Sequence, residues 1–276
     1  SAVRPLAGAS AAASVNSDPN PDNNCATVVT EVTTAPGPAP CDLTNRGTDF
    51  WLTFPGNYAP DPTNPPQITL YIVGPAGTTG RVEVPGLPVP FSSNFAIPVP
   101  TVGASASVTV MLPSATDLRD TNDQVVAKGV HLTASAEVAV FGMNYVEFTA
   151  DSFLALPKPM WGREYIVLGY QNVQENAPEL NGTQFAVVAG ENKTLVTITP
   201  SVATGSHAGG VPFNITLEQG DVYQLRNTNA APADLSGTII TSSKPVAVFG
   251  GHACASIPSS TTFFCNTVVE QLLPVE

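Results

Sequence analysis

The string Val-Ala-Val-Phe-Gly occurs twice in this chain, at residues 138–142 and again 108 residues later, at 246–250. The similarity extends upstream, because GVHLTASAEVAVFG (129–142) aligns with GTIITSSKPVAVFG (237–250). Similarity of a sequence to itself at a long spacing is typical of a structural unit that is present more than once. We therefore expect two related units in tandem.

Two further pairs of segments extend the duplication. GTDFWLTFPGN (47–57) resembles GTQFAVVAGEN (182–192), and DSFLALPKPMWGREY (151–165) resembles NTVVEQLLPVE (266–276). On this alignment the second unit stops one strand short of the first, so we expect it to be C-terminally incomplete. The chain is then a fragment of a longer polypeptide, or the strand comes from the N-terminal arm or a neighbouring subunit.

Alternation of apolar and polar residues identifies the elements of each unit as β-strands. The segments QITLYIV (67–73), SVTVML (107–112) and KTLVTIT (193–199) have period two, and turns rich in Pro and Gly interrupt the chain every 8–15 residues. No segment has a convincing helical period, although one short helix is allowed near 113–122. The expected fold class is all-β, with tandem antiparallel β-sandwich-like units.

The expected organisation has three parts. Residues 1–45, poor in aromatic side chains and rich in Ala and Pro, form an extended N-terminal arm or linker. Residues 46–170 form sandwich unit one. Residues 171–276 form unit two, either separate from unit one or fused with it.

Charge and hydropathy exclude several classes of partner. The chain has 276 residues, a net charge of −12 and only 10 basic residues, which disfavours nucleic acid and anionic membrane surfaces. No run of 18 or more apolar residues is present, so membrane insertion is not expected. The four cysteines form two local pairs without CxxC spacing, Cys25 with Cys41 and Cys254 with Cys265. Two disulfides in an extracellular, cell-surface or periplasmic protein are predicted, with buried free thiols as the alternative.

The string Gly251-His252-Ala253-Cys254 raises the question of catalysis. On a strand, His252 and Cys254 point to the same face, as a nucleophile and its base must. A disulfide to Cys265 would remove the thiolate, and this is the preferred interpretation. No serine-hydrolase elbow is present, and a glycoside hydrolase is disfavoured because the chain has only two Trp to form sugar platforms. No catalytic residue is predicted.

The segment DLRDTND (117–123) is the candidate metal site. It places Asp117, Asp120 and Asp123 at intervals of three residues, and oxygen-rich loops of this kind can ligate calcium. The spacing matches no EF-hand, so a solvated acidic loop is the alternative. No other cofactor is expected.

Several of these strings resemble a known family. GTDFWLTFPGN, the VAVFGGHACASIP…C…VVEQLLPV segment and the Trp-Gly-x-x-Tyr after Leu-Pro resemble the amino-terminal domain of the IgG Fc-binding protein family, over residues 46–276. The resemblance implies an extracellular all-β binding or structural module and not an enzyme. A protein or glycoprotein partner is expected. It carries over no binding residue and does not imply that this chain binds IgG.

The expected function is that of an extracellular binding or adhesion module of a larger cell-surface or secreted protein. The alternative is a structural subunit of a surface assembly, anchored by its N-terminal arm and able to exchange strands with neighbouring subunits.

Overall fold

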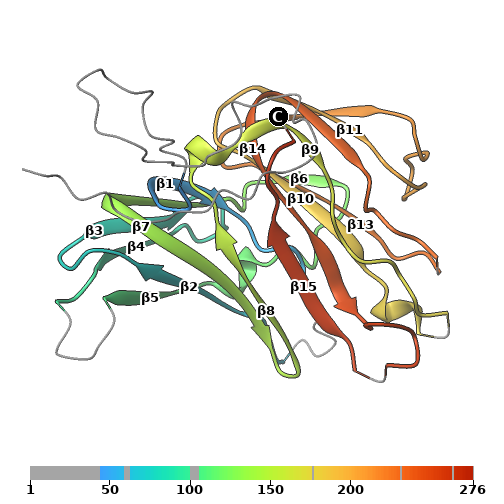
Figure 1. The fold of residues 1–276 in the computed structure, drawn as a ribbon, viewed down its shortest axis with the longest axis horizontal. Coiled ribbons are helices and arrows are strands. Elements are labelled where there is room, and N and C mark those ends of the chain that lie inside the picture. Colours follow the sequence, from blue (N-terminus) through green and yellow to red (C-terminus); the bar gives the residue numbers. More distant parts are fainter. Residues whose placement is uncertain are drawn as a thin grey trace, which may run out of the picture. The chain divides into compact units, whose positions relative to one another are not determined.

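The computed structural model describes residues 44–58, 63–99, 106–175, 177–230, 232–262 and 264–275. These residues form strands β1–β15 and short 3-10 helices, and the strands make two antiparallel sheets (Figure 1). The expected all-β fold of two similar antiparallel units is therefore confirmed. Nearly all of the expected N-terminal arm lies outside the described residues.

The first sheet has the strand order β4-β3-β7-β2-β5, and β1 and β8 also pair with β7. Alternation sets its two faces, as in β2, where Ile68, Leu70 and Ile72 are buried and the residues between them face outward. The strands are β1 (Gly47–Leu52), β2 (Gln67–Val73), β3 (Thr79–Val84), β4 (Phe91–Ala96), β5 (Ser107–Leu112), β7 (Val130–Val146) and β8 (Thr149–Ala155).

The second sheet has the order β12-β11-β14-β10-β13-β6, and β9 and β15 also pair with β14. Its strands are β6 (Gln124–Val126), β9 (Gly162–Ile166), β10 (Thr183–Ala189), β11 (Thr194–Thr199), β12 (Phe213–Leu217), β13 (Val222–Asn227), β14 (Ile239–Ala255) and β15 (Asn266–Gln271). Single turns of 3-10 helix, η2 (Ser114–Thr116), η3 (Lys158–Met160) and η4 (Pro178–Leu180), lie between strands.

The pairing register shows that the seven strands of the first sheet have counterparts in the second, which adds β6 at the edge. The long strands β7 and β14, of 17 residues each, carry the repeated string. Leu70 of β2 pairs with Gly142 of β7, as Phe185 of β10 pairs with Gly250 of β14. The same comparison makes β3, β4, β5 and β8 the counterparts of β11, β12, β13 and β15.

One part of the sequence alignment is wrong. Gly47 of β1 pairs with Val138, and Gly162 of β9 pairs with Val246 at the same point of the repeat. The counterpart of β1 is therefore β9, and not β10 as the Gly-Thr-x-Phe strings suggested. The strand after Leu156-Pro157 thus begins the second sheet. That the second unit is C-terminally incomplete stays a prediction. Two strands that precede residue 170 in the chain, β6 and β9, pair within the second sheet. The unit boundary at residue 170 stays a prediction.

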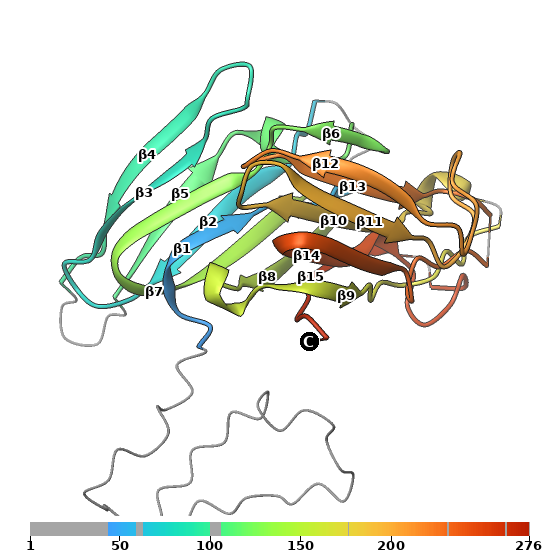
Figure 2. The ribbon, with the colours of Figure 1, turned by 90° about the horizontal axis from the view of Figure 1, so that it is seen from above.

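The two faces of the second sheet belong to different cores. Alternate residues of β10 and β14, such as Val187 and Val248, enclose a core within the second sheet. The residues between them, such as Ala186 and Phe249, belong to a core shared with the first sheet. Phe249 contacts Phe153 of β8 edge-to-face, with ring centroids 5.2 Å apart. The first unit therefore covers the outer face of the second sheet, and β8 and β15 lie side by side (Figures 1 and 2).

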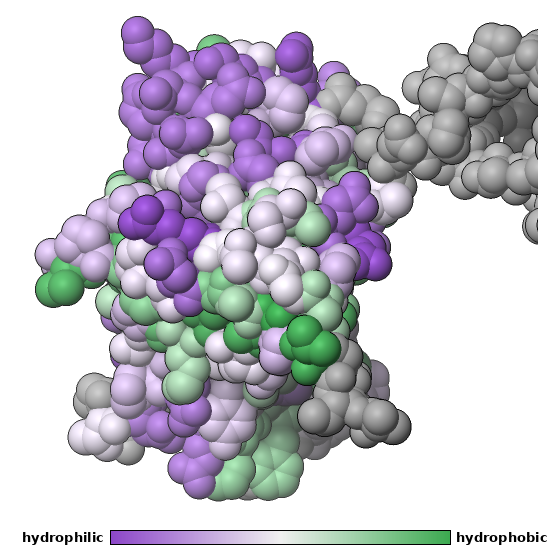
Figure 3. Space-filling view, turned by 90° about the vertical axis from the view of Figure 1, so that its left-hand side faces the viewer, coloured by the Kyte–Doolittle hydropathy of each residue, from purple (hydrophilic) through white to green (hydrophobic). Residues whose placement is uncertain are grey.

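The surface is not uniformly polar. On one side of the molecule a green band of hydrophobic residues lies between more hydrophilic regions (Figure 3). Within the described part of the chain, no helix is long and apolar enough to cross a membrane.

Candidate functional site

The structure contains the expected disulfide between Cys254 and Cys265. It closes the loop that joins β14 to β15, with the two Cα atoms 5.0 Å apart, a usual separation for a bridge. A disulfide of this kind persists in an oxidising compartment. Cys25 and Cys41, expected to form a second bridge, lie outside the described residues.

His252 is a buried structural residue in this arrangement. Its Nδ1 accepts a hydrogen bond from the Cys254 N–H at 2.9 Å, and its Nε2 lies 3.0 Å from Oδ1 of Asn172 and 3.3 Å from the backbone nitrogen of Gly182. Burial lowers the pKa of His252 to about 4, and the positive charge of Arg226 acts in the same direction. The ring is therefore neutral near pH 7, and the bridged sulfur beside it is no nucleophile.

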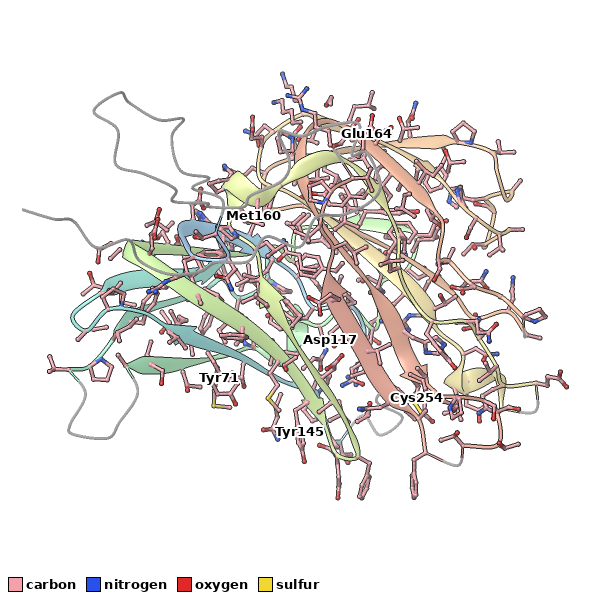
Figure 4. All side chains as sticks on the ribbon, in the orientation of Figure 1. Tyr71, Asp117, Tyr145, Met160, Glu164 and Cys254 are labelled. Carbon is pink, nitrogen blue, oxygen red and sulfur yellow. A yellow bond between two sulfur atoms is a disulfide. The ribbon has the colours of Figure 1, made fainter. Side chains whose placement is uncertain are left out.

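Asp117 lies buried between the strands of the two sheets (Figure 4). Its carboxylate accepts hydrogen bonds from Nδ2 of Asn144 at 2.6 Å and from the backbone N–H of Arg119 at 2.7 Å and of Asn57 at 3.3 Å. Burial nevertheless raises the pKa of Asp117 to about 6. This carboxylate holds three segments of the first unit together.

The other two predicted calcium ligands lie elsewhere. Asp120 is exposed and pairs with Nε of Arg119 at 3.5 Å. Asp123 accepts a hydrogen bond from the Tyr223 hydroxyl at 2.6 Å and lies 2.9 Å from Nε2 of His207. Across the described ranges, no three His, Cys, Asp or Glu side chains form a group that could hold a metal ion. Calcium binding at this loop stays a prediction, which the geometry does not support.

Two buried glutamines of the second sheet hold the segments of the first unit in place. Nε2 of Gln184 donates to the Gly56 carbonyl at 2.8 Å, and Oε1 of Gln224 accepts from the Gly56 N–H at 2.9 Å. Nε2 of Gln224 also donates to the carbonyls of Leu118 and Thr121. The acidic loop is thereby fixed to the second sheet, which explains its order without a metal.

A polar cleft of about 480 Å³ opens beside this network. Arg119 and Arg226 contribute its positive charge, and Nε of Arg226 donates to Oε1 of Gln184 at 3.0 Å. Asp120 and Glu179 contribute negative charge, so the cleft is mixed in sign. The lining residues are Asn57, Tyr58, Arg119, Asp120, Glu179, Asn181, Arg226, Thr228 and Ala253.

Next to this cleft, two equivalent hairpin tips each expose a phenylalanine. Phe148 lies at the tip between β7 and β8 and is 84% exposed, and Phe264 lies in the loop between β14 and β15 and is 73% exposed. An apolar pocket of about 260 Å³ lies between them. We call the two rings and this pocket the twin-tip surface; its residues are Tyr58, Glu147, Phe148, Thr149, Leu180, Cys254, Phe264 and Cys265.

The tips are held to each other by hydrogen bonds. The Ala150 N–H donates to Oδ1 of Asn266, and the Thr267 N–H donates to Oγ1 of Thr149, both at 2.8 Å. Phe148 has a φ of +71°, which is uncommon for a residue with a side chain and is kept only where the surrounding structure holds it. The disulfide restrains the second tip. Both aromatic rings are therefore presented on supported backbone.

Sequence reasoning did not select Phe148 or Phe264. The available signals were an aromatic residue inside the short turn after the alternating segment and another directly before a disulfide cysteine. Neither signal distinguishes an exposed aromatic from a core residue, because exposure depends on how the two units pack.

Comparison with known proteins supports the resemblance drawn from the sequence. A family model described as IgGFc binding protein matches residues 151–276. The human protein named IgGFc-binding protein is 38% identical over 141 residues, which cover 50% of this chain and 2% of that protein. The chain therefore corresponds to a very small part of this relative. No solved structure matches.

Proposed function

We propose that this chain is an extracellular, non-catalytic module that binds another protein through the twin-tip surface. The observation that carries the proposal is the pair of exposed phenylalanines, Phe148 and Phe264, on two equivalent supported tips. The family match over residues 151–276 and the Cys254–Cys265 disulfide support the class of function and the compartment. The relative's name makes the Fc part of immunoglobulin G the first ligand to test.

The twin-tip surface has the properties of a protein-binding hot spot. Aromatic side chains supply large contact area at a low cost in conformational entropy, and energetically dominant interface residues are often aromatic. The pocket between the tips has room for one apolar side chain of a partner. Tyr58 lines both this pocket and the polar cleft, so arginine and asparagine side chains lie beside the aromatic anchors.

Binding of the chain to immobilised Fc and to a panel of secreted glycoproteins, with Fab fragments as a reference surface, tests the proposal. The double substitution Phe148→Ser with Phe264→Ser should weaken binding by about thirtyfold, since hot-spot truncations cost about 2 kcal/mol. The matched control replaces Val89 and Val211, exposed valines outside this surface, with serine and should leave the affinity unchanged.

Two outcomes would contradict the proposal in different ways. Binding that survives the double phenylalanine substitution would remove the twin-tip surface as the site. If neither Fc nor any protein of the panel is retained by the native chain, protein binding itself loses its support.

An adhesive role in a larger surface protein is the finer form of this proposal. The alternative of a subunit anchored by its arm stays a prediction, because residues 1–43 lie outside the described ranges.

A further inference from the structure

The polar cleft contains two arginines whose terminal nitrogens lack hydrogen-bond partners. Nη1 of Arg119 and Nη2 of Arg226 are buried, and neither bonds to a described residue. The other terminal nitrogen of each guanidinium also donates no hydrogen bond within the described part of the chain. Buried donors without a partner are costly, so such a group in a native structure points to a ligand, an ion or a water molecule. Since both side chains line the same cleft, one ligand can satisfy both.

Gly56 brings the two arginines close to each other. A Cβ atom at this position would overlap Nη2 of Arg226 and the backbone of Arg119, so glycine is what leaves room for both. Gly56 is itself fixed by hydrogen bonds to Gln184 and Gln224. Nε of Arg226 donates to Oε1 of Gln184 at 3.0 Å. The guanidinium of Arg226 is therefore positioned beside the Arg119 backbone before any ligand binds.

The protein's own carboxylates do not occupy these nitrogens. Asp117 accepts from Asn144 and from backbone N–H groups, and not from a guanidinium. Asp120 reaches only Nε of Arg119, at 3.5 Å, and because its side chain is 84% exposed this pair is weak. Arg226 forms no ion pair with a described residue. Burial lowers the pKa of Arg226, and the negative charges of Asp117 and Asp120 act against this shift.

The exposed groups of the cleft select the kind of anion that fits. Asp120 and Glu179 are exposed carboxylates, which accept hydrogen bonds from hydroxyl or amide groups and repel a second negative charge. Tyr58 and Thr228 add hydroxyl groups that bond to no described residue. The volume of about 480 Å³ is within the range of small-molecule sites. A ligand with one carboxylate and several hydroxyl groups suits this arrangement.

We propose that this cleft binds an acidic sugar. The sugar carboxylate binds the guanidinium groups of Arg119 and Arg226, which suit the planar, bidentate geometry of a carboxylate. The sugar hydroxyl groups donate to Asp120 and Glu179. A sulfate or phosphate dianion, or an acidic peptide, would place more charge beside these two carboxylates, in a chain whose net charge is already −12. The proposal does not rest on protein binding by the twin-tip surface.

Titration of the full chain with N-acetylneuraminic acid and with glucuronic acid, followed by amide NMR spectra, tests this proposal. The signals of Gly56, Arg119 and Arg226 should shift saturably with both acids. The methyl ester of N-acetylneuraminic acid has nearly the same shape without the charge, and it should bind at least about tenfold more weakly.

Two substitutions in the cleft and one outside it provide the matched comparison. Arg119→Gln removes the charge and Arg226→Lys keeps it without the planar fork, so each should weaken sugar binding by about tenfold. Arg81→Gln, at an arginine of the first sheet that does not line the cleft, should leave it unchanged. The melting temperature checks that each variant is folded. Equal binding of the methyl ester, full binding in both cleft variants, or no shift at the cleft would overturn the proposal.

Inorganic sulfate and a tetraglutamate peptide separate a sugar from other sources of negative charge. Both should bind more weakly than the sugar acids, and Asp120→Asn with Glu179→Gln should narrow this difference. Tighter binding of sulfate or of the peptide, or a difference that does not narrow, would overturn the assignment to a sugar. Phe148→Ser with Phe264→Ser should leave sugar binding unchanged, because neither phenylalanine lines the cleft. The failure of this proposal is therefore distinguishable from the failure of the proposed function.

Discussion

Asn144 and His252 occupy the same position in the two units and bind equivalent asparagines. Nδ2 of Asn57 donates to Oδ1 of Asn144 at 3.2 Å, and Nε2 of His252 lies 3.0 Å from Oδ1 of Asn172. Asn57 and Asn172 each follow the first strand of their unit and are buried. The duplication thus repeats a polar pair within an apolar fold, with a titratable ring in one copy only.

This substitution makes the second unit sensitive to acid. His252 has a pKa of about 4 in the fold against about 6.5 when unfolded, so between these values the unfolded chain binds more protons. Its contribution to stability is full above pH 6.5 and is lost as the pH falls toward 4, by about 3 kcal/mol in total. His252→Asn, which copies the first unit, should remove this loss. Urea unfolding of the native chain and of His252→Asn between pH 4 and pH 6.5 checks this prediction. If the difference in unfolding free energy between the two proteins does not change with pH, the prediction is contradicted.

Asp117 should act with the opposite sign. Its pKa is about 6 in the fold against 3.8 in the unfolded chain, so the folded protein binds the extra proton. The contribution is full below pH 3.8 and is lost as the pH rises through 6, by about 3 kcal/mol. Asp117→Asn should therefore lose stability relative to the native chain as the solution is acidified, on top of a constant cost for its altered hydrogen bonds. A relative stability independent of pH would show that the carboxyl group is not protonated there.

Phe249 and Phe141 provide a matched pair for the energetics of the internal interface. Phe249→Ala removes a fully buried ring that contacts Phe153 and should cost about 3–5 kcal/mol of unfolding free energy. Phe141→Ala, at the equivalent but partly exposed position, should cost clearly less, because 38% of this residue is already exposed in the fold. Denaturant unfolding measures both. Similar costs at the two sites would contradict the difference in burial.

The architecture could be predicted from the sequence because alternation and repetition are local signals. The repeated string marks β7 and β14, the longest described strands, each of which pairs with four other strands of its sheet. The equivalence of β1 with β9 could not be found in this way. Gly-Thr-x-Phe at residues 47–50 and 182–185 is similar in letters, whereas strand identity is set by the pairing partner and its register.

The acidic loop shows the same limit at the site. Three aspartates at regular spacing predict shared ligation, but Asp117 and Asp123 are each directed by a partner far away in the sequence. Asn144 binds Asp117 from β7, and Tyr223 binds Asp123 from β13. The exposure of Phe148 likewise depends on a backbone conformation with positive φ that an alternating pattern does not encode.

The Cys254–Cys265 bridge should stabilise the second tip and the whole fold. Replacing both cysteines with alanine frees a loop with a sequence separation of 11, and loop-closure entropy predicts a loss of about 3 kcal/mol. Substitution is a sharper test than a reductant, because it changes this bridge alone. Urea unfolding of the two proteins under the same oxidising conditions gives the difference. Equal stabilities would show that the loop is already ordered by its hydrogen bonds.

Tyr165 and Phe50 offer a last comparison, because they occupy the same place in β9 and β1 and both are buried. The Tyr165 hydroxyl accepts a hydrogen bond from the Gly162 N–H at 2.9 Å and donates to the Val246 carbonyl at 2.7 Å, so it supports the point where β9 joins β14. Tyr165→Phe would leave both backbone groups buried without this partner, at a cost of about 1–3 kcal/mol, even though phenylalanine is the residue that the first unit uses.

The control for this substitution is Tyr170→Phe, which removes a solvent-exposed hydrogen bond to the Pro258 carbonyl and should cost little. Chemical denaturation measures both variants, and amide hydrogen exchange at Gly162 and its neighbours shows whether the loss is local. If Tyr165→Phe is as stable as the native chain, the N–H of Gly162 and the carbonyl of Val246 have found other partners. The hydroxyl would then not be what holds the first strand of the second unit in register.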